Sequence, residues 1–218
     1  MNRLQVELQR LYGSADAPDR AAVLELAGAG GWAELAKVWQ GVQADLDLPA
    51  PGIAVNGSDA YQLWFSFDEA PDDAQTGRFL SALRARYLRD VPAARVRLVL
   101  RPATTLPMQT DTDRWSAFVT PDLAALFDQG PWLDMPPGTE AQAELLSRLR
   151  GIRRDGLERA LQRLEAAEQV AATTTLEAAG GEEEDPRRFL LRVMNDPGVD
   201  MGLRIEAARA LLQEGARR

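Results

Sequence analysis

Residues 52–67, GIAVNGSDAYQLWFSF, decide the fold class of this chain. Two apolar runs, GIAVNG and YQLWFSF, meet at the turn-prone sequence Asn56-Gly57-Ser58-Asp59. Apolar and aromatic runs on either side of such a turn are typical of a β-hairpin. Both faces of the two runs are largely apolar, so we expect the hairpin to lie at the centre of a sheet.

Further elements extend outward from this hairpin. Apolar residues at helical spacing and capping residues predict helices over four ranges: 2–12, 19–28, 32–44 and 72–90. Strands are predicted in ARVRLVLRP at 94–102 and in RWSAFVT at 114–120, with a short helix at 123–127 after the second. The pattern indicates an α+β domain with a mixed or antiparallel sheet flanked by helices.

The last third of the chain is predicted to be mostly helical, starting from Thr139. Residues 171–186 lack periodicity and carry Gly-Gly and an acidic run, which predicts a mobile linker. Two short amphipathic segments follow, at 187–195 and 202–214, and predict a helical hairpin as a C-terminal helical extension. We therefore divide the chain into an α+β domain at 1–170, a linker at 171–186 and a hairpin tail at 187–218.

Composition restricts the chemistry open to the chain. It has 218 residues, 45% of them apolar, and contains no cysteine and no histidine. Disulfides, thiolate sites, imidazole metal ligation and histidine-assisted serine catalysis are therefore excluded. The acid pairs that offer oxygen ligands lie where caps and polar turns are expected, so we expect no metal and no cofactor. A charged N-terminus and the lack of a long apolar window predict a protein of a bacterial-type cytoplasm without membrane contact.

Charge is distributed unevenly along the chain. The net charge is −8, yet residues 78–101 hold seven arginines against one aspartate. Arginines aligned on the outer face of a strand suit bidentate contact with phosphates, and a tryptophan beside them offers a stacking surface for a base. The candidate nucleic-acid-binding residues are Arg95, Arg97, Arg101, Arg114 and Trp115. Arginines on a solvated face, or paired with carboxylates, need no ligand, and this alternative remains open.

The middle of the chain resembles a known family. The stretch IAVNGSDAYQLWFSFDEAPDDAQTGRFLSALRARYL resembles a segment of archaeo-eukaryotic primase-type proteins, the primase-polymerases. In that segment a strand, a turn rich in Ser and Gly, and a Gly-Tyr-His-Leu-Trp-like strand precede a long helix. Further on, LPMQTDTDRWSAFVTPDL is similar to the family's Leu-Pro-Leu-Gln segment and the Ser-Val-Phe-Val-Asp strand after it. With its helical continuation, the resemblance covers about 53–161.

The resemblance implies a degenerate, noncatalytic relative. Gln62 stands where such enzymes carry the histidine that contacts the incoming nucleotide, and Thr120 stands where an acidic residue is expected. An Asp-x-Asp motif on a strand before the helix at 32–44 is not found. Without paired carboxylates there is no two-metal site to activate a 3′-hydroxyl, so we expect that the chain is not an enzyme.

The tail carries a second resemblance. The stretch DPRRFLLRVMNDPGVDMGLRIEAARALL resembles a short helical motif near the ends of phage small-terminase-like proteins. A helical hairpin behind a flexible linker suggests docking to a protein partner. The candidate partner-binding residues are Phe189, Leu190, Met194, Leu203 and Ile205. A hairpin that packs back onto its own domain is the open alternative.

Three hypotheses about function follow. The first is a noncatalytic primase-like module that binds nucleic acid or a DNA-processing partner through the arginine face. The second is a protein-interaction adaptor of phage-related or packaging type that acts through the tail. The third is a residual nucleotidyltransferase that uses Asp111 and Asp113.

Overall fold

The computed structural model describes residues 2–14, 19–28, 30–127, 130–180, 186–195 and 201–215. For residues 170–180, 186–189, 192, 207 and 210–215 it describes the backbone alone. The chain divides into two compact units, residues 1–167 and 168–218, and each is described by itself.

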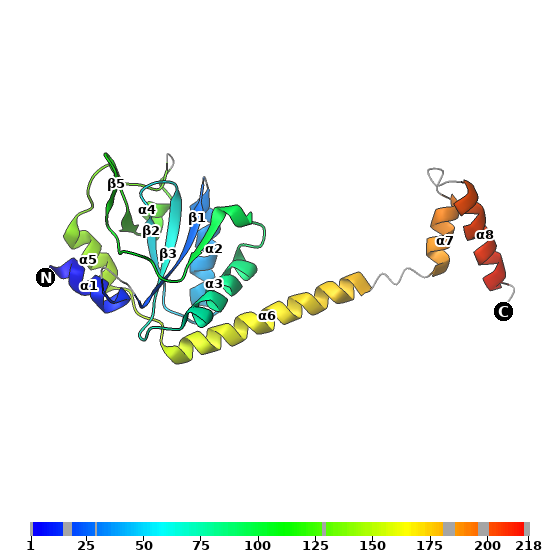
Figure 1. Ribbon diagram of the computed structural model, residues 1–218, viewed down its shortest axis with the longest axis horizontal. Coiled ribbons are helices and arrows are strands. Elements are labelled where there is room, and N and C mark those ends of the chain that lie inside the picture. Colours follow the sequence, from blue (N-terminus) through cyan, green and yellow to red (C-terminus); the bar gives the residue numbers. More distant parts are fainter. Residues whose placement is uncertain are drawn as a thin grey trace. The chain divides into compact units, whose positions relative to one another are not determined.

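The first unit is built on a five-stranded antiparallel sheet with the strand order β4-β1-β3-β2-β7 (Figure 1). The strands are β1 (Ala21–Ala27), β2 (Gly52–Val55), β3 (Ala60–Ser66), β4 (Val96–Val99) and β7 (Ala117–Val119). β2 and β3 form the predicted hairpin, with Ile53 opposite Leu63. β3 occupies the centre of the sheet, and nearly all of its residues are buried. The central hairpin predicted from the sequence is therefore confirmed.

The helix predicted at 19–28 is wrong, because these residues form β1 between β3 and β4. Ala, Leu and Glu are good helix formers, so the sequence AAVLELA is ambiguous by itself. In the folded chain Leu24 and Leu26 pack in one layer while Val23 packs in the other. Only the twofold period of a strand buries both sets, and pairing on both sides overrides the local preference.

The single strand predicted at 114–120 is divided in two. β6 (Arg114–Trp115) pairs with β5 (Gln109–Asp111) in a separate two-stranded sheet, whereas β7 joins the main sheet beside β2. Ser116 lies between them and bonds to Met108, with its N–H 2.9 Å from the Met108 oxygen. The chain thus changes partner at Ser116, which a run of apolar residues does not reveal.

Helices cover both faces of the main sheet, and the fold is α+β (Figure 1). One layer combines α2 (Gly31–Ala44), α3 (Asp73–Tyr87) and the first turns of α6 (Arg154–Gly180), and it packs around Phe65 and Phe79. The other layer combines α1 (Arg3–Tyr12) and α5 (Thr139–Ser147) over Trp64 and Phe118. The helices predicted at 2–12, 32–44 and 72–90 are confirmed as α1, α2 and α3. The short helix expected at 123–127 is α4 (Pro121–Ala124), and a 3-10 turn, η1 (Ala93–Arg95), precedes β4.

A buried glutamine closes the outer edge of β7. The Phe118 N–H donates to Oε1 of Gln142 at 2.9 Å, and the Gln142 Nε2 donates to the Phe118 oxygen at 2.8 Å. Gln142 lies on α5, and its side chain is only 6% exposed. A side-chain amide carries the same donor and acceptor as a peptide group, so Gln142 takes the place of a neighbouring strand. It satisfies backbone groups that an edge strand would otherwise leave open.

A buried tyrosine hydroxyl lies without a partner among the described residues. The Tyr12 ring stacks on Phe118, with centroids 5.9 Å apart, and meets Trp64 edge-on at 5.4 Å. Tyr12 is fully buried at the end of α1, and its hydroxyl has no hydrogen-bond partner in the described part of the chain. Tyr12 therefore contributes through its aromatic ring, while its hydroxyl carries an uncompensated loss of hydration.

The second unit contains two short helices, α7 (Pro186–Asn195) and α8 (Met201–Gly215), which pack against each other. Arg204 of α8 joins them, since its Nε donates to the Met194 oxygen at 2.9 Å. Both helices were predicted and are confirmed, whereas residues 196–198, the predicted turn, lie outside the described residues. The backbone is helical over 171–180, where the sequence shows no helical periodicity, and 181–185 lie outside the described residues, so the linker at 171–186 stays a prediction. None of the described helices is both long and apolar enough to cross a membrane.

Candidate anion-binding site

The arginines predicted to bind nucleic acid already have intramolecular contacts. Arg95 ends η1, and its Nε donates to the Ala27 oxygen at 2.8 Å. Arg97 lies on β4, with its NH1 3.8 Å from Oε1 of Glu25. Arg101 lies beyond β4 and pairs with Asp73 in the first turn of α3 at 2.6 Å.

Arg114 and Trp115 lie at the opposite side of the sheet. They form β6, which leads through Ser116 into β7, the edge strand farthest from β4. Four strand spacings of about 4.8 Å put roughly 19 Å between these edges. The guanidinium of Arg114 stacks 4.2 Å from the Trp132 ring centroid, and the Trp115 N–H donates to the Leu133 oxygen at 2.9 Å. The structure therefore does not bring the five predicted residues together on one surface.

Arg97 completes a polar chain across three strands. The Trp64 Nε1 donates to Oε1 of Gln62 at 2.8 Å, and the Gln62 Nε2 donates to Oε2 of Glu25 at 2.6 Å. Arg97 approaches the other oxygen of Glu25 at 3.8 Å. Because the Glu25 side chain is only 14% exposed, Arg97 serves as its counter-ion. Gln62 is thus held by two neighbours, Trp64 and Glu25.

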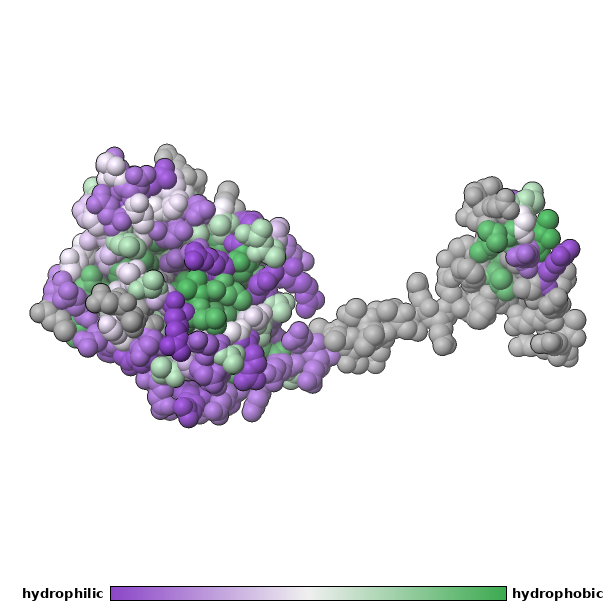
Figure 2. All heavy atoms as spheres, viewed as in Figure 1, coloured by the Kyte–Doolittle hydropathy of each residue, from purple (hydrophilic) through white to green (hydrophobic). Residues whose placement is uncertain are grey.

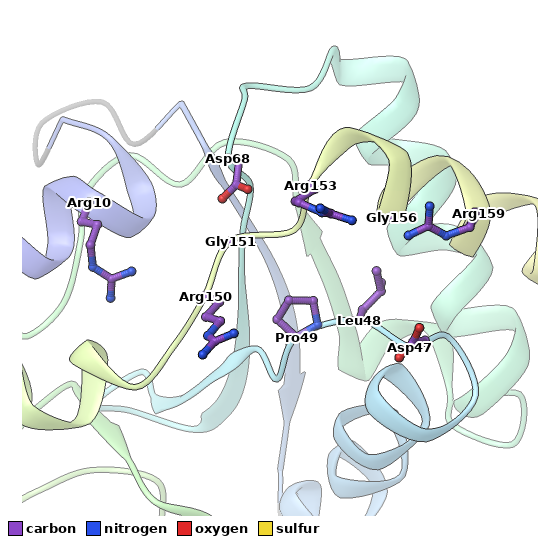
Figure 3. Close-up of a pocket in the computed structure, with 10 residues that line it drawn as sticks. All are labelled: Arg10, Asp47, Leu48, Pro49, Asp68, Arg150, Gly151, Arg153, Gly156 and Arg159. Atoms are coloured by element: carbon purple, nitrogen blue, oxygen red, sulfur yellow. The ribbon is translucent and has the colours of Figure 1, made fainter.

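A different group of arginines surrounds a cleft of about 580 Å³ (Figure 3). We call it the arginine cleft. It is lined by Arg10, Asp47, Leu48, Pro49, Asp68, Arg150, Gly151, Arg153, Gly156 and Arg159. These residues come from α1, the α2–β2 connection, the end of β3, the α5–α6 connection and the start of α6. Four arginines thus face two aspartates in a protein whose net charge is −8.

Backbone hydrogen bonds fix the segment that carries Arg150 and Arg153. Ile152 forms a parallel bridge with Phe67, in which its N–H donates to the Ser66 oxygen at 2.8 Å. The Asp68 N–H returns a bond to the Ile152 oxygen at 3.0 Å. A Cβ atom at Gly151 would collide with the Asp68 carboxylate, so glycine permits this close approach. The segment is held like a short extra strand at the end of β3.

The four arginines differ in how strongly they are held. Arg10 has a structural role, because its NH2 donates to the Leu146 oxygen at 2.9 Å and its Nε pairs with Glu7 at 2.7 Å. Arg153 and Arg159 extend toward each other (Figure 3) and both contact Asp155, at 3.0 and 2.7 Å. The hydrogen bond from Arg159, with the positive charges of both arginines, holds the pKa of Asp155 below its usual value.

These contacts leave donors for a ligand. The Arg153 and Arg159 side chains are 69% and 51% exposed, and exposed ion pairs are weak enough to exchange for a stronger anion. Arg150 is exposed, and its side chain makes no hydrogen bond or ion pair among the described residues. Guanidinium groups on opposite walls of a concave site suit the oxygens of a phosphate. The exposed guanidinium groups of the cleft could thus contact an anion.

The sequence does contain a signal for part of this site, but the larger excess of arginine over 78–101 drew the prediction to that stretch instead. Residues 148–163 hold six arginines against two acids. From the sequence this stretch was predicted to be helical throughout. The prediction therefore missed the interruption of the helix at Gly151 and Ile152. Arg10 lies some 140 positions away in the sequence, so its place in the cleft follows only from the fold.

The remaining candidate residues lie elsewhere. In the tail, Leu190 and Met194 are partly buried, Leu203 and Ile205 are 56% and 48% exposed, and the side chain of Phe189 lies outside the described part. Asp111 ends β5, and both it and Asp113 are exposed. Within the described ranges, no group of three or more acidic side chains is placed to hold a metal ion.

Comparison of the sequence with protein-family models and with curated proteins finds no match.

Proposed function

We propose that this protein is a noncatalytic module that binds nucleic acid, with the phosphates of a single strand entering the arginine cleft. The observation that carries the proposal is the grouping of four arginines around one cleft of about 580 Å³, one from α1 and three from residues 150–159. Arg150, Arg153 and Arg159 supply exposed guanidinium groups on its walls. A concave site with donors on facing walls requires a backbone that can enter it, which a flexible single strand provides.

The charge of the whole protein supports a localised site. A net charge of −8 repels a polyanion at long range, so binding must come from a few close contacts. Each arginine that contacts a phosphate releases a counter-ion from the strand, and this makes the affinity fall as salt rises. We therefore expect weak binding with a steep dependence on ionic strength.

The proposal keeps the resemblance to primase-type proteins and assigns no reaction to it. Gln62, in the place of the nucleotide-contacting histidine, has both polar atoms of its side chain bonded to Trp64 and Glu25. Glu25 in turn is shared with Arg97. These contacts support a structural role for the polar chain on the sheet and leave phosphate binding to the cleft.

A pair of double variants tests the site. Arg150→Ala with Arg153→Ala removes two cleft donors, whereas Arg97→Ala with Arg101→Ala removes two arginines of the predicted face at the same change in charge. For a labelled single strand titrated by fluorescence anisotropy, we expect the cleft variant to lose at least about tenfold in affinity and the slope of log K against log salt to shrink by roughly 1.4. Circular dichroism checks that both variants fold.

The control decides between the two arginine groups. Equal losses in the two double variants would mean that only overall charge matters, and a larger loss in the Arg97 variant would restore the face predicted from sequence. No binding of the unaltered protein at low salt would remove the proposed function.

A second candidate function, a protein-interaction adaptor, has its own observation. Met201, Leu203 and Ile205 of α8 remain 63%, 56% and 48% exposed after α7 and α8 have packed together, and Figure 2 shows hydrophobic atoms on the surface of this unit. Exposed apolar side chains that lie close together are typical of interaction surfaces. Capture of a partner that survives nuclease treatment and is lost in Leu203→Asp would favour this function.

A further inference from the structure

The two edges of the main sheet differ in how their backbone groups are satisfied. At the β7 edge, Gln142 bonds to both the N–H and the C=O of Phe118. At the opposite edge lies β4, a strand of four residues that pairs with β1 on one side only. None of the residues 96–100 is buried, and no described side chain bonds to their main chain as Gln142 bonds to Phe118. Within the described residues, the β4 edge is therefore open.

The alternation of an antiparallel ladder shows which β4 groups are unpaired. The Phe67 N–H donates to the Arg20 oxygen at 2.9 Å, which continues the register of the β1–β3 ladder by one residue pair. Even-numbered residues of β1 thus point their main chain to β3, and odd-numbered ones, such as Glu25, point to β4. Glu25 faces Arg97, so the main-chain groups of Arg97 point to β1 and those of Leu98 point away from the sheet. Neither the N–H nor the C=O of Leu98 has a hydrogen bond in the part of the chain that the structure describes.

The side chains along this edge differ between the two faces of the sheet. Leu98 packs partly against the core of the α2–α3 layer, and Leu100 beyond it is 37% exposed beside Gly77 of α3. Arg97 and, beyond the strand, Arg101 occupy the alternate positions, with side chains 74% and 57% exposed. Both belong to exposed ion pairs within the chain, which are weak enough to exchange for another carboxylate. An added strand would meet apolar side chains on one face and guanidinium groups on the other.

We propose that the open edge of β4 binds an extended segment of a partner protein, in which apolar residues alternate with acidic ones, as a sixth, antiparallel strand. The segment's residue opposite Leu98 exchanges main-chain bonds with it, and the apolar side chains of the segment lie over Leu98 and Leu100. The intervening acidic residues face Arg97 and Arg101. In strand addition of this kind, the main chain supplies affinity and the alternate side chains supply specificity. The edge is independent of the arginine cleft.

Charge favours such a partner over a second copy of this chain. If two β4 strands paired with Arg97 opposite itself, two guanidinium groups would meet directly. With Leu98 opposite itself, the two Arg97 side chains become diagonal neighbours on one face, roughly 7–8 Å apart. Charged side chains on an edge strand discourage pairing between copies in this way. The same side chains attract a strand that carries carboxylates at the matching positions.

A methylated peptide series tests the main-chain pairing. The probe is labelled Val-Glu-Val-Glu-Val-Glu-Val with blocked ends, and fluorescence anisotropy reports its binding to the full chain. Antiparallel pairing directs the valine N–H groups toward β4 and the glutamate N–H groups away from it. Methylating two valine nitrogens should weaken binding at least about tenfold, whereas methylating two glutamate nitrogens should weaken it less than about threefold. The reverse pattern would refute the antiparallel arrangement, and equal effects would refute main-chain pairing.

Two variants at Leu98 change the edge itself. Leu98→Pro removes the outward N–H, and edge strands tolerate proline where the N–H has no partner in the fold. Leu98→Val has a similar size and keeps the N–H. Binding of the unmethylated probe should fall at least about tenfold in the proline variant and less than about threefold in the valine variant. Equal binding by the two folded variants would overturn the proposal. If circular dichroism shows that Leu98→Pro does not fold, the methylated probes decide the question alone.

The charge of the probe separates the β4 edge from the arginine cleft. Arg97→Gln should weaken binding at least about threefold, whereas Arg148→Gln, at an exposed ion pair at the end of α5, makes the same change in charge and should have little effect. A loss in Arg150→Ala with Arg153→Ala, without a loss in Arg97→Gln, would place the probe in the cleft and overturn the proposal. No saturable binding to the unaltered chain up to about 1 mM probe would also overturn it, and would leave the proposed function untouched.

Discussion

Gln142→Ala is expected to lower the free energy of unfolding by about 2–5 kcal/mol, because it leaves two buried backbone groups of Phe118 without partners. Each unpaired buried donor or acceptor costs about 1–3 kcal/mol, and water cannot easily replace the amide in a site that is 6% exposed. The loss is a large fraction of the total for a domain whose stability is typically about 5–15 kcal/mol. Urea denaturation followed by circular dichroism measures it.

Two further variants separate this mechanism from a simple loss of volume. Gln109→Ala also removes a glutamine-to-backbone bond, from Nε2 to the Thr112 oxygen at 2.8 Å, but that bond is exposed and its loss should cost less than about 0.5 kcal/mol. Gln142→Glu keeps the shape but lacks the donor while ionised, and protonation restores it. We therefore expect Gln142→Glu to be severely destabilised at neutral pH and to recover partly as the pH falls. Equal stability of the Ala and Glu variants at every pH would contradict the strand-replacing role.

Tyr12→Phe is expected to stabilise the protein, by about 1–2 kcal/mol. The hydroxyl is fully buried and has no partner among the described residues, so its removal relieves a cost of lost hydration while the ring contacts with Trp64 and Phe118 remain. The midpoint of urea unfolding should rise with an unchanged slope. Tyr87→Phe is the matched control, because its hydroxyl donates to Asp45 at 3.0 Å and its loss should not stabilise. A less stable Tyr12→Phe would show that the hydroxyl has a bonding partner.

The same residues predict the alkaline limit of stability. Burial raises the pKa of Tyr12 above its ordinary value, and burial with the hydrogen bond to Asp45 raises the pKa of Tyr87 to about 12. In the unfolded chain both hydroxyls ionise near pH 10, so the unfolded state loses protons first and is favoured as the pH rises. Stability should fall from pH 10 upward, with Tyr12 contributing up to about 1.4 kcal/mol per pH unit. Tyr12→Phe should make this decline shallower.

The sequence predicted correctly those elements whose ends are set by turn or capping residues close to them in the chain. The β2–β3 hairpin is set by the turn at Asn56-Gly57, where the Asn56 side chain accepts from the N–H of Ser58, Asp59 and Ala60. α3 is set by Asp72, whose carboxylate accepts from the Gln75 N–H at 2.6 Å. These contacts span at most four residues, so they are visible in sequence.

The features that the sequence did not reveal depend on distant partners. β1 is a strand because β3 and β4 lie on either side of it, although its residues are good helix formers. The cleft depends on Ile152 pairing with Phe67, a contact across 85 positions that converts part of an expected helical region into an extended segment. The sequence showed the alternating arginines around β4. It did not show that Arg97 and Arg101 pair with Glu25 and Asp73, because these acids lie far away in sequence.

The α5–α6 connection is held in place through its main chain, whereas its side chains line the cleft. Main-chain bonds to Ser66 and Asp68 hold Ile152, and the Ser66 hydroxyl donates to the main-chain oxygen of Arg150 at 3.1 Å. These main-chain bonds do not depend on the side chains at 150 and 153, although Arg153 adds an exposed ion pair with Asp155. If the cleft binds an anion as proposed, substitutions at 150 and 153 should change its selectivity at little cost in folding, because the loop is held by its main chain.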